Sequence, residues 1–137
     1  MAFQNPPDAT IKALLSRSQT VAVVGCSPDP TRDSHHIAQL LRARGHRVIP
    51  VNPGHQTLLG ETCYASLRDI PEPVDMVDIF RRSEHVAPIV DDAIEVGAKI
   101  VWMQLGVIDE RSAEKAQQAG LTVVMDRCPA IEYRRLF

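Results

Sequence analysis

One loop near the start of the chain carries residue types suited to binding phosphate. It follows an apolar, β-branched run over 20–25 and contains Cys26, Ser27 and Arg32 before a helical pattern begins. A helix start offers unpaired backbone N–H groups and partial positive charge, and a guanidinium is a forked, permanently charged donor. The strand-loop-helix setting predicts that Ser27, the loop amides and Arg32 contact phosphate. The alternative is that these are ordinary loop residues.

A second cluster of positive charge follows another strand. Arg81 and Arg82 come directly after Phe80, at the end of an alternating run over 74–80. The carboxyl ends of strands share one edge of an open parallel sheet, so this cluster could meet the same ligand from the opposite side. Alternatively, Phe80 is a core residue and the arginines begin the next helix in solvent. A ligand with several phosphates would account for both clusters together.

Cys128 is the candidate for thiol chemistry. It precedes Pro129 at the start of a terminal helical pattern, where the helix field and Arg127 favour the thiolate form. Such a thiol would be redox-sensitive, although a lone cysteine is also a common small buried hydrophobe. Cys26, inside the first loop, allows the same two interpretations.

The first loop departs from the dinucleotide-binding fingerprint. That fingerprint needs three glycines in G-x-G-x-x-G, and only Gly25 is present. It also needs an acidic residue at the end of the second strand to bind a ribose hydroxyl, where this chain has Val51, Asn52 and Pro53. Both differences make a nicotinamide dinucleotide a weaker hypothesis.

Composition and charge narrow the class of protein. The chain has 137 residues, 45% of them hydrophobic, and a formal net charge of -2, which argues against nucleic-acid binding through an overall basic field. Three scattered cysteines predict neither disulfides nor a zinc site, and no apolar run is long enough to cross a bilayer. His35 and His36 point about 100° apart on a helix, so no metal is predicted. We therefore expect a cytoplasmic protein without a membrane or nucleic-acid partner.

Strand and helix patterns alternate along the chain and position these groups. Predicted strands cover 20–25, 46–51, 74–80, 99–104 and 121–125, and helices cover about ten residues capped by Asp8, then 34–44, 83–96, 112–119 and 129–135. The run over 74–80 places acidic residues in a strand, where a buried one needs a partner. We predict one α/β domain over 1–137, a doubly wound, mainly parallel, Rossmann-like sheet with helices on both faces. Residues 1–7 are expected to form a loose N-terminal segment.

Taken together, the strand ends resemble a known family. The motifs V-A-V-V-G-C-S with Arg32 downstream, V-I-P-V-N-P, G-E-T-C-Y-A-S-L-R-D-I-P, V-D-M-V-D-I-F-R, V-W-M-Q-L-G and D-R-C-P resemble the small stand-alone CoA-binding proteins. Those proteins are similar in fold to the CoA-binding domain of the succinyl-CoA synthetase α subunit. The resemblance covers nearly the whole chain from about residue 10. It implies a Rossmann-like domain that holds the ADP-3′-phosphate end of CoA against the first loop.

The resemblance also implies roles for single residues. Gly25, Ser27 and Arg32 would hold phosphate, Val51, Asn52 and Pro53 would line the adenosine, Phe80 and Arg81 would lie along the ligand, and Gln104 and Cys128 would lie towards the pantetheine thiol. Cys26 shares the first loop. The family commonly has a basic residue directly after Asn-Pro, whereas this chain has Gly54 and His55. One phosphate contact is therefore missing or replaced by the weaker His55.

The sequence predicts a non-catalytic protein that binds CoA or acyl-CoA as its small-molecule partner. A synthetase needs a phosphorylatable histidine and a separate nucleotide-binding region, and both lie outside the segment that the resemblance covers. Two other classes stay open. One is a redox sensor that binds NAD(H) or another nucleotide. The other is a thiol-dependent enzyme, or a carrier of a CoA mixed disulfide, that uses Cys128. The sequence does not determine whether the chain has a protein partner.

Overall fold

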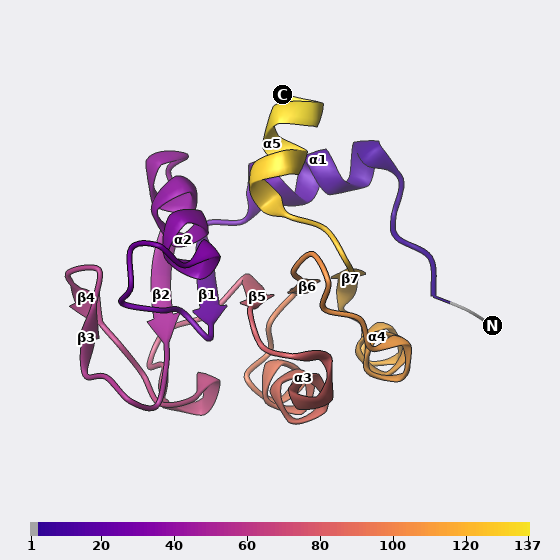
Figure 1. The fold of residues 1–137 in the computed structure, drawn as a ribbon. Coiled ribbons are helices and arrows are strands. Elements are labelled where there is room, and N and C mark those ends of the chain that lie inside the picture. Colours follow the sequence, from indigo (N-terminus) through magenta and orange to yellow (C-terminus); the bar gives the residue numbers. More distant parts are fainter. Residues whose placement is uncertain (1–2) are drawn as a thin grey trace.

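The computed structural model describes residues 3–137 and contains one five-stranded parallel sheet (Figure 1). The strands lie in the order β2-β1-β5-β6-β7, and every neighbouring pair is parallel. Their bounds are β1 Thr20–Val24, β2 Arg47–Val51, β5 Met76–Ile79, β6 Ile100–Met103 and β7 Thr122–Val124. The predicted doubly wound α/β fold is confirmed. The winding reverses between β1 and β5, which is where such sheets bind ligands.

Helices cover both faces of this sheet (Figure 1). Their bounds are α1 Asp8–Arg17, α2 Asp33–Ala43, α3 Val86–Glu95, α4 Glu110–Gln118 and α5 Pro129–Leu136. Helices α1, α2 and α5 pack on one face and α3 and α4 on the other. Two 3-10 turns, η1 Leu67–Asp69 and η2 Ser83–His85, and a hairpin of β3 Thr57–Leu58 and β4 Glu61–Thr62 complete the chain.

The apolar run in β1 reflects burial on both faces. Val21 and Val23 pack with α1, α2 and α5, whereas Ala22 and Val24 pack with α3 and α4. Successive side chains of a strand point to opposite faces, so a central strand between two helical layers must be apolar at every position. This requirement explains why the sequence shows a continuous run there and not an alternation.

Two helix starts differ from the sequence-based prediction. Helix α4 begins at Glu110, before the predicted position 112, because the Asp109 side chain accepts a hydrogen bond from the Ser112 N–H at 3.1 Å. Asp8 does not cap α1. Pro7 occupies the cap position, and the Asp8 carboxylate instead accepts two hydrogen bonds from Arg135, each 2.8 Å long. The carboxylate thus joins the first helix to the last.

The N-terminal segment is attached to the sheet. Of the segment 1–7 that the sequence predicts to be loose, residues 1–2 lie outside the described residues. Asn5 donates its side-chain amide to the Met125 carbonyl at 2.9 Å and accepts from the Met125 N–H at 2.7 Å. The amide therefore takes the place of a backbone partner just beyond edge strand β7. Residues 3–7 form no helix or strand, and Asn5 contacts the end of the sheet.

Asp75 and Asp78, the two acidic residues of the run over 74–80, differ in whether their carboxylates have hydrogen-bond partners. The Asp75 carboxylate accepts hydrogen bonds from the backbone N–H groups of Gln19 and Thr20, each at 2.9 Å. Asp78, in central strand β5, is fully buried on the face covered by α2, and within residues 3–137 neither of its carboxyl oxygens has a hydrogen-bond partner. Burial raises the pKa of the Asp78 carboxyl well above its usual value, because the charged form loses its hydration.

Asp78 should make folding stability depend on pH. The pKa of the Asp78 carboxyl is higher in the folded than in the unfolded state. The contribution of Asp78 to folding stability is therefore fully present below the unfolded pKa, and it is lost as the pH rises towards the folded pKa. Asparagine does not titrate, so the free energy of unfolding of Asp78→Asn should rise relative to that of the native protein as the pH increases. Between the unfolded and the folded pKa of Asp78, we expect this difference to grow by about 1.4 kcal/mol per pH unit. Urea unfolding from pH 4.5 to 8 measures this difference. Parallel stability profiles for the two proteins would contradict it.

Candidate functional site

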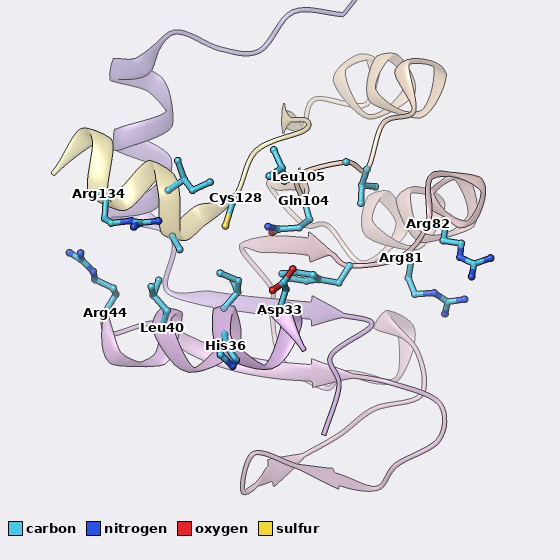
Figure 2. A pocket seen from close by; sticks show the side chains of 16 residues that line it. Asp33, His36, Leu40, Arg44, Arg81, Arg82, Gln104, Leu105, Cys128 and Arg134 are labelled. Carbon is cyan, nitrogen blue, oxygen red and sulfur yellow. The ribbon is translucent and has the colours of Figure 1, made fainter. Parts of the chain in front are cut away.

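A cleft of about 920 Å³ lies between α2 and α5, on the face of the sheet that these helices cover (Figure 2). Helix α2 lines it with Asp33, Ile37, Leu40 and Arg44, whose spacing of three to four residues places them on one face. The ends of β5 and β6 form the floor. The lining residues are Asp33, His36, Ile37, Leu40, Arg44, Phe80, Arg81, Arg82, Gln104, Leu105, Gly106, Val107, Cys128, Ala130, Ile131 and Arg134.

The charge of the cleft is strongly positive. Four arginines line it against one carboxylate, that of Asp33. Figure 2 shows Arg81 and Arg82 at one end of the cleft and Arg44 and Arg134 at the other. Arg82 lies 3.7 Å from Glu84, an exposed and weak pair. Because the protein as a whole has a net charge of -2, this local excess marks the cleft as a place for an anion.

Seven of the residues singled out in the sequence line one of two cavities, whereas Cys26, Ser27, Arg32 and Asn52 line neither of them. Phe80, Arg81, Gln104 and Cys128 all line the large cleft. A separate pocket of about 150 Å³ lies at the ends of β1 and β2, and its lining includes Gly25, Val51, Pro53 and again Arg81. Arg81 is thus the residue that the two cavities share.

Gly25 allows the ends of β1 and β5 to lie close together. It adopts a φ of +85°, and a Cβ placed there would lie 2.7 Å from the Phe80 carbonyl oxygen and 3.0 Å from the Arg81 Cδ. Any larger residue would clash with backbone, so glycine is required by protein packing as well as by its positive φ. The first loop therefore begins in contact with the second arginine cluster.

The first loop is largely hydrogen-bonded to itself. The Ser27 N–H donates to Ser34 Oγ at 3.0 Å, and the Asp29 N–H donates to Ser27 Oγ at 3.1 Å. The Thr31 N–H donates to the Asp29 carboxylate at 2.9 Å. Arg32 precedes α2, is exposed, and lines neither the cleft nor the small pocket. In this conformation, several amides expected to bind phosphate already have partners within the loop.

Asn52 fixes this loop to the end of β2. Its side-chain amide donates to the Cys26 carbonyl at 2.9 Å, and its Oδ1 accepts from the Gly54 N–H at 3.0 Å. Burial raises the pKa of the Cys26 thiol to about 12, with the neighbouring Cys63 and Asp78 adding smaller contributions. Cys26 is therefore a neutral, packed thiol. Asn52 has a structural role that does not depend on a ligand.

Cys128 differs from Cys26 in its surroundings. It is half-buried, occupies the cap position of α5, and contributes its side chain to the cleft (Figure 2). Arg127, expected to stabilise its thiolate, is engaged elsewhere: its Nε lies 3.8 Å from Glu132 Oε1 and its Nη1 donates to the Asp126 carbonyl at 2.9 Å. The expected pairing of Arg127 with Cys128 is therefore absent from this structure, and the reactivity of Cys128 stays a prediction.

Gln104 adds a polar group to the floor of the cleft. Only 7% of its surface is exposed, and its Oε1 has no hydrogen-bond partner within residues 3–137. A buried acceptor without a donor is unfavourable by about 1–3 kcal/mol. Because the Oε1 atom is itself buried, a ligand N–H or O–H would reach it only after the side chain turned towards the cleft.

Sequence reasoning missed the residues that the two helices contribute. Ile37, Leu40 and Arg44 belong to the predicted helix over 34–44 and Arg134 to that over 129–135, but the sequence assigns none of them to a binding site. Their signal in the sequence is weak, since arginines are common near helix C-termini for electrostatic reasons. Only the packing of α2 beside α5 brings these side chains to one cleft.

Comparison with known proteins connects this geometry to a family. Residues 19–134 match the protein family described as "CoA binding domain". The chain belongs to the CoA-binding domain family. This CoA-binding domain protein is 39% identical over 126 residues to the uncharacterized protein YneT of Bacillus subtilis, a match that covers 92% of this chain and 93% of YneT. The family predicted from the strand-end motifs is thus confirmed.

Solved structures and a larger enzyme share the domain. A hypothetical protein from Pyrococcus horikoshii is 37% identical, covers 99% of both chains and superimposes with a TM-score of 0.92. An ADP-forming acetate–CoA ligase of Archaeoglobus fulgidus is 28% identical over 120 residues, which are 80% of this chain but 18% of the ligase. This CoA-binding domain protein therefore corresponds to a small part of that enzyme.

Two further observations concern the part of the chain that the structure describes. None of its helices has the length and apolar character needed to span a membrane. Nor do three or more metal-ligating side chains gather at one point between residues 3 and 137.

Thiol reactivity should separate the three cysteines of this CoA-binding domain protein. We expect a bulky thiol reagent to add once to the native protein, at Cys128, because Cys26 and Cys63 are buried. Intact mass and peptide mapping measure the adduct. Unfolded protein, in which the reagent can reach all three cysteines, is the control. If the Cys128→Ser variant formed an adduct as fast as the native protein does, the assignment to Cys128 would be contradicted.

Proposed function

We propose that this CoA-binding domain protein binds CoA or an acyl-CoA without transforming it. The observation that carries this proposal is the positive cleft beside the switch point of the sheet, in a chain whose family is described by CoA binding. CoA carries three phosphate groups and a long, less polar pantetheine arm. A site for it needs cations at one end and a partly apolar channel beyond them, and the cleft has both.

The two cavities suggest how the ligand is divided. The ADP end would lie at the loop after β1, with the small pocket of Gly25, Val51 and Pro53 beside it. Arg81 belongs to both cavities, so it would meet the phosphates where the ligand passes from one to the other. Binding at Ser27 and Arg32 would require the loop to exchange some of its internal hydrogen bonds for bonds to phosphate.

The pantetheine arm would then follow the large cleft. Phe80 would pack against it, and an amide N–H of pantetheine would donate to Gln104 Oε1, the acceptor that lacks a partner within residues 3–137. The thiol end would lie near Cys128. Each of these contacts uses a side chain that already lines the cleft.

The arrangement of titratable groups supports binding without catalysis. The cleft lining contains one histidine, His36, and one carboxylate, Asp33, and both stand on α2. Cys128 begins α5, which forms the opposite wall. A nucleophile needs a base within hydrogen-bond reach, and these groups are not grouped in that way. Holding the cofactor is the activity that this lining supports.

Binding measurements test the proposal directly. We expect calorimetry on deligated protein to detect CoA, and Arg81→Gln to weaken binding at least tenfold because it removes a charged donor from the phosphates. Arg32→Ala, tested in parallel, reports whether the first loop contributes. Arg111→Gln, on the exposed surface of α4, is the matched control and should bind as the native protein does. Absence of heat with CoA and acetyl-CoA would overturn the proposal.

A second candidate function rests on the position of Cys128 in the same cleft. Its thiolate could attack CoA disulfide, forming a protein–CoA mixed disulfide and releasing one CoA thiol, so that both sulfur atoms and electrons balance. We expect intact mass after incubation with CoA disulfide to increase by one CoA, and reductant to reverse the change. Cys128→Ser is the control. An unmodified native protein would exclude this function and leave reversible binding as the alternative.

A further inference from the structure

The far end of the cleft carries a second pair of positive charges. Arg44 follows the C-terminus of α2, and Arg134 lies in the last turn of α5. Both side chains line the cleft, at the end opposite Arg81 and Arg82 (Figure 2). The ion pairs of residues 3–137 involve neither Arg44 nor Arg134. Two unneutralised guanidinium groups that share a cavity favour an anion between them.

The position of these two arginines is not explained by their helices alone. A helix C-terminus favours a cation on any of its faces, whereas Arg44 and Arg134 both line the cleft, and Arg44 also borders a second cavity that contains Tyr133. The Arg44 guanidinium lies over the Tyr133 ring, 4.5 Å from its centroid. The Tyr133 hydroxyl in turn is hydrogen-bonded to the buried His46 ring. The aromatic platform therefore holds one of the two charges in place.

The lining between the two ends of the cleft is partly apolar. Helix α2 contributes Ile37 and Leu40, and α5 contributes Ala130 and Ile131. Leu105 and Ile131 are 58% and 42% exposed, which leaves apolar surface uncovered. Asp33, His36 and Gln104 add polar groups to the same stretch (Figure 2). A complementary ligand is anionic at both ends with a partly apolar segment between them.

We infer that the cleft selects CoA thioesters of short dicarboxylic acids, whose distal carboxylate pairs with Arg44 and Arg134. The inference rests on the proposed function, which puts the thiol end of CoA near Cys128. Cys128 and Arg134 are six residues apart, about 9 Å along the axis of α5. An acyl chain of four or five carbons spans about 5 Å, and an ion pair adds about 3 Å. The length of a short dicarboxylyl group bound by an ion pair is therefore similar to this axial separation of the two backbone positions.

A pair of matched ligands tests the inference. Glutaryl-CoA and valeryl-CoA have acyl groups of equal carbon number and differ in a terminal carboxylate against a methyl group. We expect the native protein to bind glutaryl-CoA at least tenfold more tightly, the size of effect typical of charge-assisted hydrogen bonds. Competition calorimetry measures the ratio, which should fall as salt is raised, because the arginine pair is exposed to solvent.

Variants at the far end separate this inference from the proposed function. Arg44→Gln with Arg134→Gln should abolish the preference while leaving the affinity for free CoA unchanged within twofold. Arg134→Gln alone should reduce the preference for glutaryl-CoA. Because this single variant leaves the Arg44–Tyr133 contact intact, it tests the inference even if the double variant misfolds. Arg111→Gln should keep both properties.

Three results would overturn the inference. If the native protein binds glutaryl-CoA and valeryl-CoA with equal affinity, the inference is wrong, whereas the proposed function is unaffected. Weaker binding of free CoA by the double variant means that Arg44 and Arg134 hold phosphate, with the ligand reversed in the cleft. Native protein that binds no form of CoA removes both the inference and the proposed function.

Discussion

The close approach of two strand ends organises the functional edge of this protein. At the point where the sheet reverses its winding, the backbone of Gly25 meets the Phe80 carbonyl so closely that no side chain fits between them. This contact places the first loop next to Arg81, which borders both cavities. With a residue larger than glycine, the ends of β1 and β5 would have to separate. The cleft and the small pocket would then no longer share a residue.

Beneath the cleft, the sheet contains polar groups that the protein does not satisfy. Asp78 is buried, which raises the pKa of its carboxyl well above the usual value, and Gln104 presents an acceptor without a donor among residues 3–137. Most buried polar groups in folded proteins have partners, so such exceptions concentrate where function requires them. Gln104 belongs to the lining of the cleft, although its Oε1 atom is buried. Asp78 is fully buried in central strand β5 on the same face, where we expect it to make the stability of the fold depend on pH.

Much of the fold and part of the site could be predicted because they depend on local rules. A strand buried on both faces must be apolar throughout, which made β1 recognisable, and parallel strands must end at one edge. The second rule predicted that Phe80 and Arg81 lie at the ligand edge of the sheet, and the family resemblance added Gln104 and Cys128. The structure places all four residues in the lining of one cleft. Helix boundaries were less accurate where a cap decided them, as at Asp109.

What the sequence by itself determined is the fold class, the family and the strand ends that could meet a ligand, because hydrophobic periodicity and short motifs are properties of neighbouring residues. Tertiary structure alone decided that the binding edge is two cavities joined at Arg81 and that the first loop bonds to itself. It also decided that Arg44 and Arg134 face one cleft. The physical reason is that these features depend on how α2 and α5 pack against the sheet, and residues about ninety positions apart carry no local signal of that packing.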